Sequence, residues 1–155
     1  MLNLMKILYD CGAITNNEIE KLGIDMSIVD GLLRKEQLVC KRVGNDFFYF
    51  LTDFGEKVYR LNTNCKQFFR CGNYAKMKSL LEFYSSLSED VRKTWKSKDL
   101  WYVEGYVGAI PDATYLKDGK MYAVYVTTKN TNKTLVENVE KFVKDKNIEN
   151  ITYLK

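Results

Sequence analysis

The first third of the chain places apolar residues at helical spacing in short segments that polar residues and glycines separate. Residues 2–10 gather most of their apolar side chains near one helical face, and Gly12 ends this first helix. A second helix is predicted to begin after Thr15, which has capping-box spacing to Glu18, and to end at Gly23. The pattern therefore predicts two short helices at the start of the chain.

A third helix is predicted within residues 25–39, DMSIVDGLLRKEQLV. Ser27 and Asp30 again have the spacing of an N-terminal cap. The buried stripe of this helix consists of Ile28, Val29, Leu32 and Leu33. Three short helices with a tight connection between the last two are typical of a helix-turn-helix.

An alternating pattern follows the third helix and predicts a hairpin. The two strands are residues 38–43, LVCKRV, and residues 47–51, FFYFL, with Gly44 and Asn45 at the turn. Thr52 then caps a helix in the run TDFGEKVYRL. Three helices, a hairpin and a closing helix together predict a winged helix over residues 1–62.

Residues 63–98 are predicted to form a basic helical connector. Within it, the run YAKMKSLLEFYSSL has the pattern of an amphipathic helix. The apolar face of that helix consists of Tyr74, Met77, Leu80, Leu81 and Tyr84. Flanking helices of this kind often pair two winged helices, so we expect a homodimer that presents two half-sites.

The last third, residues 99–155, predicts a small α/β domain with a mixed sheet. Strands are expected at residues 100–107, 110–116 and 121–128. Asp118-Gly119 between the last two is the strongest hairpin signal in the chain, because this pair accepts the positive φ of a tight turn. A helix over residues 134–146 and a final strand, NITYL, complete a β-β-β-α-β order, and the fold class of the whole chain is α+β.

The composition removes several classes of enzyme and site. The 155 residues include no histidine, which excludes Ser-His-Asp and Cys-His catalysis and metals held by histidine. The chain has no phosphate-binding loop of the Walker type and no nucleophile elbow. The spacing of the four cysteines, Cys11, Cys40, Cys65 and Cys71, matches no zinc site. We therefore expect neither a bound metal nor a cofactor.

The distribution of apolar residues also bears on location. No apolar run approaches the roughly 18 residues that span a bilayer. The N-terminal run is too short for a secretory signal, and Asp10 interrupts it. We therefore expect a cytoplasmic protein with no membrane partner.

The formal net charge of +4 is unevenly distributed along the chain. Residues 1–62 hold 8 Lys/Arg against 9 Asp/Glu, residues 63–98 hold 8 against 3, and residues 99–155 hold 8 against 8. The basic excess lies in the middle of the chain. Attraction to phosphate must come mainly from there, or from a local basic face elsewhere.

A winged helix reads double-stranded DNA with its third helix and grips the backbone with its hairpin. The outward positions of the third helix are Ser27, Asp30, Gly31 and Arg34. The hairpin adds Lys41, Arg42 and Asn45. Since the helical face carries a single positive charge, a winged helix used for protein contacts or dimerisation remains an alternative.

Further contacts to a phosphate backbone are expected from the basic middle of the chain. The candidates there are Arg92, Lys93, Lys96 and Lys98. An ordinary solvated basic segment is the alternative for this cluster.

Three stretches carry a resemblance to a known family: YFLTDFGEKVYRL, LWYVEG, and Pro111-Asp112 ahead of the second hairpin. Over its full length the chain resembles the replication-relaxation family of plasmid and phage proteins, in which a winged helix precedes a nuclease-like domain. The element order of the last third resembles the core of PD-(D/E)xK nucleases. The resemblance implies a DNA-associated role in the biology of a mobile element, and it does not by itself imply cleavage.

Cleavage by such a core needs two carboxylates that hold a divalent cation and a lysine that orients or activates water. Asp112 supplies one carboxylate, but Tyr125 and Thr127 occupy the matching positions on the next strand. We therefore expect no catalytic residues, with Asp112 kept as a turn or cap residue. A magnesium-dependent nuclease that uses Asp112, Glu104 and Lys129 remains an alternative.

The sequence thus favours a non-catalytic DNA-binding protein of a plasmid or phage. Its expected role is transcriptional regulation, or assistance to replication or transfer. Two alternatives stay open at this point: the nuclease, and an interaction module that binds a host or phage protein and uses neither DNA nor metal.

Overall fold

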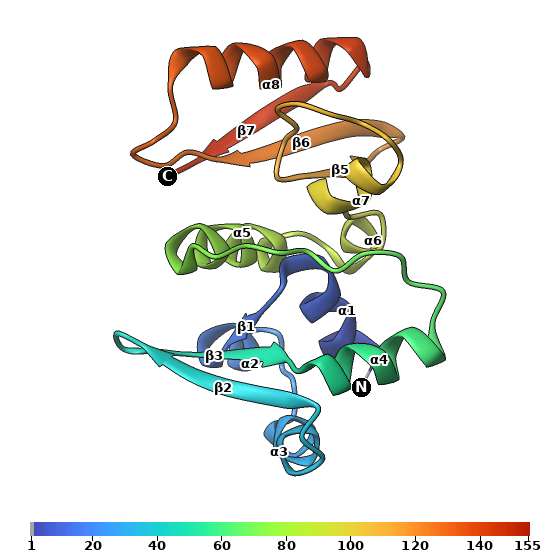
Figure 1. Cartoon of the computed structure of the whole chain (residues 1–155), viewed down its shortest axis with the longest axis vertical. Helices are drawn as coiled ribbons and strands as arrows, with labels where there is room; N and C mark the ends of the chain where they lie inside the picture. Colours follow the sequence, from blue (N-terminus) through green and yellow to red (C-terminus); the bar gives the residue numbers. More distant parts are fainter. Residues whose placement is uncertain (1) are drawn as a thin grey trace. The chain divides into compact units, whose positions relative to one another are not determined.

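The computed structural model describes residues 2–155 and shows an α+β fold in two units, Met1–Ser85 and Ser86–Lys155. Each unit is described by itself (Figure 1). The segment of residues 63–98, which the sequence suggests as a connector, divides between the two units. None of the helices in residues 2–155 combines the length and the apolar character that crossing a bilayer requires.

The first unit builds a small sheet among short helices. Its elements are α1 (Leu2–Cys11), β1 (Ile14–Thr15), α2 (Asn16–Lys21), α3 (Met26–Arg34), β2 (Leu38–Val43), β3 (Asp46–Leu51), α4 (Asp53–Asn62) and α5 (Tyr74–Ser86). The sheet has the order β1-β3-β2, and both pairings are antiparallel. The predicted helices and hairpin are confirmed, whereas the two-residue strand β1 was not expected from the sequence.

Side-chain caps fix where the helices of the first unit begin. Thr15 accepts a hydrogen bond from the backbone N–H of Glu18 at 3.3 Å, as the capping-box spacing predicts. The prediction that Ser27 caps α3 is wrong, because Asp25 is the cap and accepts from the N–H of Ser27 at 2.8 Å. Asp25 precedes an apolar stripe just as Ser27 does, and the sequence pattern alone ranks neither first.

The start of α4 shows why its first turn carries a glycine. Thr52 caps the helix by accepting from the N–H of Gly55 at 3.0 Å. A Cβ atom at Gly55 would lie 2.1 Å from the carbonyl oxygen of Gln37, which is far inside van der Waals contact. The same carbonyl accepts from the N–H of Thr52 at 3.1 Å. Glycine thus lets α4 press directly onto the backbone that leads into the hairpin.

The core of the first unit holds together α1, the sheet and α5. Its fully buried apolar side chains include Leu4, Ile7, Leu8, Ile14, Ile19, Val29, Phe48, Phe68, Phe69, Leu80 and Leu81. One polar link crosses it: the Tyr84 hydroxyl of α5 donates to a carboxylate oxygen of Asp10 in α1 at 2.9 Å. Lys6, one turn earlier on α1, also pairs with that oxygen.

The second unit has a four-stranded mixed sheet with the order β4-β5-β6-β7. Its elements are α6 (Glu89–Arg92), β4 (Lys96–Ser97), α7 (Lys98–Val103), β5 (Ala113–Lys117), β6 (Lys120–Val126), α8 (Lys133–Asp145) and β7 (Asn150–Leu154). β5 and β6 are antiparallel, and β6 and β7 are parallel. The tight turn between β5 and β6 is confirmed, since Asp118 and Gly119 both have positive φ, 52° and 75°.

One predicted strand of the second unit is wrong. Residues 100–107 do not form a strand, because α7 begins at Lys98 and ends at Val103. The buried Trp101 gives the reason: its indole N–H donates to the Thr114 hydroxyl at 3.1 Å, and its ring meets that of Phe142 edge-on at 5.2 Å. Aromatic and β-branched residues favour strands in general, but this packing overrides the preference. The β-β-β-α-β order is therefore corrected to β4-α7-β5-β6-α8-β7.

Candidate nucleic-acid interface

The outward face of α3 is polar, as the sequence predicts. Ser27, Asp30 and Arg34 are exposed and Gly31 is half-buried, whereas Val29 and Leu32 turn into the core. The i, i+3, i+4, i+7 spacing places these four outward positions along one side of the helix. A surface ligand would therefore meet one arginine and one aspartate on α3.

The cations of the hairpin lie on opposite faces of it. Lys41 pairs across the strands with Phe48, and Arg42 pairs with Phe47. Since successive side chains of a strand point to opposite faces, the two cations cannot contact the same surface. The Lys41 ammonium lies 5.8 Å from the centroid of the Phe50 ring, and the Arg42 guanidinium lies 5.9 Å from that of Phe47.

Each face of the hairpin meets a different helix. On the face of Lys41, Phe48 and Phe50 pack edge-on against Tyr74 of α5, at 5.4 and 6.1 Å between ring centroids. On the face of Arg42 lies Tyr49, whose pKa is raised by burial and also by Cys40 and by Asp30 of α3. Figure 1 shows α3 and α5 on opposite sides of the sheet. Arg42 therefore shares its side of the sheet with α3, and Lys41 does not.

The turn of the hairpin holds Arg42 near its tip. The Arg42 Nε–H donates to the carbonyl oxygen of Gly44 at 3.2 Å, and Gly44 has a positive φ of 62°. Asn45 beside it is exposed and makes no side-chain hydrogen bond within residues 2–155. The guanidinium is thus oriented by the backbone while its remaining N–H donors stay open to a ligand.

The cations of this surface have no acidic partner. Arg34 and Lys35 at the end of α3, and Lys41 and Arg42 in β2, form no ion pair in the part of the chain that the structure describes, residues 2–155. Four other cations of the first unit pair with acids: Lys6 with Asp10, Lys21 with Glu18, Arg70 with Glu56, and Lys78 with Asp46, whereas Lys57 and Lys66 form no ion pair within residues 2–155. The cations at α3 and the hairpin are therefore available to an external polyanion.

The basic candidates of the middle segment are engaged within the second unit. Arg92 donates to the carbonyl oxygen of Leu87 at 2.9 Å. Lys93 lies 3.5 and 3.4 Å from the carboxylates of Glu89 and Asp90. Lys96 pairs with Glu104, and its ammonium lies 3.7 Å from the centroid of the Trp101 ring. Lys98 lies 3.7 Å from a carboxylate oxygen of Asp112.

Asp112, the predicted remnant of a nuclease site, is almost fully buried. One of its carboxylate oxygens accepts a hydrogen bond from the backbone N–H of Val126 at 2.7 Å. Because Asp112 directly precedes β5 and Val126 ends β6, this bond fastens the two strands together at one end of the hairpin. The idea that Asp112 acts as a local turn or cap residue after Pro111 is thus corrected to a link across strands.

The other residues of the nuclease hypothesis have different surroundings. Glu104 is exposed and pairs with Lys96, while Lys129 is exposed beyond the end of β6. Tyr125 is buried and meets Tyr153 edge-on at 6.3 Å. Among residues 2–155 there is no group of three histidine, cysteine, aspartate or glutamate side chains that could hold a metal ion.

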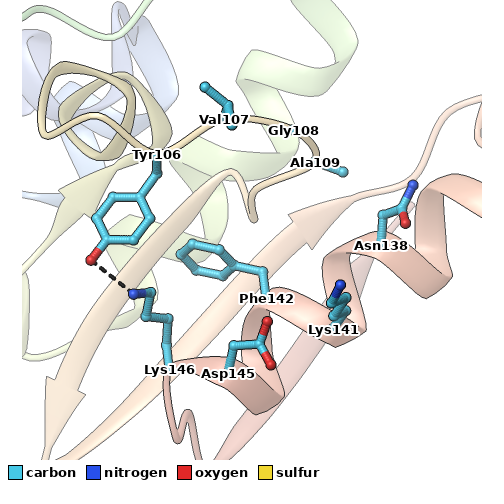
Figure 2. A pocket seen from close by; sticks show the side chains of 9 residues that line it. All are labelled: Tyr106, Val107, Gly108, Ala109, Asn138, Lys141, Phe142, Asp145 and Lys146. Carbon is cyan, nitrogen blue, oxygen red and sulfur yellow. Dashed lines mark hydrogen bonds between the residues drawn. The ribbon is translucent and has the colours of Figure 1, made fainter.

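Sequence reasoning missed a cavity of about 450 Å³ in the second unit. It lies between the loop of residues 106–109 and one side of α8 (Figure 2). No motif marks it, because it depends on how the loop after α7 packs beside α8. The sequence holds only a weak signal, the single aromatic residue Phe142 among the lysines near the end of α8.

No protein-family model, curated protein or solved structure matches the chain.

Proposed function

We propose that residues 1–62 form a winged helix and that the chain binds double-stranded DNA through α3 and the β2–β3 hairpin without cutting it. The order α1-β1-α2-α3-β2-β3, with α3 on one side of a sheet ending in a hairpin, supports this assignment. The observation that carries it is the set of exposed, unpaired cations, Arg34, Lys35 and Arg42, on one side of that sheet.

The electrostatic arrangement supports backbone contact more than base reading. Arg34 and Arg42 present guanidinium groups, which match the geometry of phosphate oxygens. Asp30, on the same face of α3 as Arg34, is repelled by phosphate but can accept a hydrogen bond from a cytosine amino group in the major groove. Binding by the first unit should therefore depend strongly on salt, with a smaller contribution from sequence.

Contacts within the second unit support DNA binding without cleavage. Asp112 is committed to the N–H of Val126, and Glu104 to Lys96. A divalent cation held by both acids would first have to disrupt these contacts. The proposed process remains transcriptional regulation, or assistance to replication or transfer, in a plasmid or phage; its support is the resemblance of the sequence.

Contact with protein is a second proposal, and α4 supports it. Phe54 and Leu61, seven residues apart on this helix, are 54% and 80% exposed. Apolar side chains at this spacing share a helical face, so they offer an apolar stripe to a second copy of the chain. Pairing of two copies would double the number of phosphate contacts. Light scattering on the chain and on Leu61→Glu would test it; a monomer in both cases contradicts pairing.

Fluorescence anisotropy with a labelled duplex tests DNA binding directly. In the presence of a chelator and at low salt, the chain should bind the duplex. Its affinity should fall steeply as the salt concentration rises, because binding releases counterions from the DNA. Arg42→Glu should weaken binding by about tenfold or more, whereas Lys41→Glu, on the other face of the hairpin, should have a clearly smaller effect. Equal losses in both variants would contradict the assigned binding face, and no binding at low salt would contradict the proposal.

A further inference from the structure

The cavity in the second unit has the size and boundaries of a ligand site. Its volume of about 450 Å³ falls within the range of small-molecule pockets, about 300–1,000 Å³. One wall is the loop from Tyr106 to Ala109, and the other is the side of α8 that carries Asn138, Lys141, Phe142 and Asp145 (Figure 2). All of these residues belong to the second unit.

The inner part of the cavity is aromatic and held in place by packing. The rings of Tyr106 and Phe142 meet edge-on at 6.0 Å between centroids. Behind them the buried Trp101 contacts both, at 5.1 Å from Tyr106 and 5.2 Å from Phe142. Because each ring is locked by the other two, the half-buried faces of Tyr106 and Phe142 form a preformed apolar surface. Such a surface suits a flat ring of a ligand.

Two ammonium groups stand beside this aromatic surface. Lys146 lies 4.0 Å from the centroid of the Tyr106 ring and donates to the Tyr106 hydroxyl at 2.8 Å (Figure 2). One of its three N–H donors is used by that bond, so the other two remain for a ligand. Lys141 is exposed and makes no ion pair or hydrogen bond within residues 2–155. One cation is therefore fixed at the cavity and the other is free to reach into it.

The remaining groups of the cavity supply hydrogen bonds. Asn138 and Asp145 lie seven residues apart on α8, and their side chains have no partner among the described residues 2–155. Gly108 in the opposite wall has a positive φ of 92°, and its carbonyl oxygen accepts from the Tyr102 hydroxyl at 3.0 Å. The loop is thus held from behind, and the amide and carboxylate of α8 are left to meet polar atoms of a ligand.

We propose that this cavity binds a nucleotide, with the base against Phe142 and Tyr106 and the phosphate between Lys141 and Lys146. An apolar ligand would cover Lys141 and Asp145 without offering either charged group a partner, which is costly. Inorganic phosphate alone would leave the aromatic surface unused. A base carrying a phosphate satisfies both parts, and Asn138 and Asp145 then face the polar edge of the base or the sugar hydroxyls. This inference is independent of duplex binding by the first unit.

Titration of the full chain with three probes tests the proposal. These are adenosine 5′-monophosphate, a short oligothymidylate, and inorganic phosphate. Trp101 contacts both rings of the cavity, so a stacked base should change tryptophan fluorescence, and isothermal titration calorimetry gives the affinity. Saturable binding of the mononucleotide supports a site for free nucleotides. Binding of the oligothymidylate alone supports a site for one nucleotide of a single strand.

Matched variants of α8 separate the cavity from general charge. Lys141→Ala should weaken nucleotide binding by about tenfold, since a charge-assisted contact to phosphate is lost. Lys144→Ala removes an exposed lysine of the same helix that does not line the cavity, and it should bind like the wild type. Equal losses in both variants would overturn the proposal. So would phosphate binding as tight as nucleotide binding, or the absence of binding by both nucleotide probes.

Discussion

Replacing Asp10 with asparagine should change how the stability of the first unit responds to pH. Burial raises the pKa of the Asp10 carboxyl from its ordinary 3.8 to about 6, and the pairing with Lys6 and the bond from Tyr84 offset only part of that effect. The carboxyl links α1 to α5, so its protonation state bears on the core of the unit. Asparagine keeps the shape and removes the titration.

The sign and size of the effect follow from the two pKa values. Because the folded chain binds the proton more tightly than the unfolded chain, the free energy of unfolding rises as the pH falls through about 6. The full gain, reached below the unfolded pKa of 3.8, is about 3 kcal/mol. Between about pH 8 and about pH 5, the wild type should gain about 1.4 kcal/mol of stability relative to Asp10→Asn.

The assay must report on the first unit alone. Both tryptophans of the chain, Trp95 and Trp101, belong to the second unit, so tryptophan fluorescence does not serve. Cys11 does, because it is 1% exposed and follows Asp10 in α1. Its alkylation in rising urea, measured by mass spectrometry against the exposed Cys40, reports the opening of the unit and corrects for the pH dependence of thiol reactivity.

A second variant guards against general effects of charge removal. Asp118→Asn changes an exposed aspartate in the β5–β6 turn, where asparagine tolerates the positive φ of 52°. Its pH profile should follow that of the wild type. If Asp10→Asn also follows the wild type between about pH 8 and about pH 5, the Asp10 carboxyl does not have the raised pKa that its burial predicts.

Three further outcomes are expected. Asp112→Ala should lower the free energy of unfolding of the second unit by about 1–3 kcal/mol, because the N–H of Val126 loses a buried, charged acceptor. Urea unfolding followed by tryptophan fluorescence measures this loss, and an unchanged midpoint would contradict the cross-strand role of Asp112. Gly55→Ala should destabilise the first unit by about 2 kcal/mol or more, because its Cβ atom would clash with the carbonyl of Gln37. Gly31→Ala has open space at its Cβ position and should stabilise the unit by about 0.5–1 kcal/mol. Cys11 alkylation in urea compares the two variants, and equal effects would contradict the close approach at Gly55. Incubation of supercoiled plasmid with magnesium or manganese should produce no nicks above background on a gel; nicking that is lost in Asp112→Asn would instead establish the nuclease alternative.

The hairpin and its flanking helices were predictable because local signals there agree with one another. The caps Thr15 and Thr52, the turn at Gly44 and the alternating strands all favour the same structure, and the contacts of the first unit use them as expected. Adjacent positions on a strand also imply that Lys41 and Arg42 face opposite ways. The sequence does not show which of the two cations lies on the side of α3. That assignment needs the strand register and the effect of the Asp30 charge on the pKa of Tyr49.

The second unit was harder to predict because its decisive contacts join residues distant in sequence. The run LWYVEGYV has strand-forming residues, yet its first residues belong to α7. The contacts of Trp101 that accompany this helix are made with Thr114 and Phe142, which lie 13 and 41 residues later in the sequence. The two-residue strands β1 and β4 exist only through pairing with a longer partner. The role of Asp112 was missed for the same reason, since Val126 is 14 residues away.

The proposed DNA-binding surface is the side of the first unit formed by α3 and the hairpin. Its most direct test compares two double variants of equal charge, Arg34→Glu/Arg42→Glu and Lys57→Glu/Lys66→Glu, each of which lowers the formal net charge from +4 to zero. Lys57 and Lys66 are exposed and form no ion pair within residues 2–155. In duplex-binding titrations over a range of salt, the arginine pair should lose about a hundredfold in affinity and reduce the salt slope by about 2, while the lysine pair stays near the wild type. Equal losses in the two variants would show that net charge, and not this surface, governs binding.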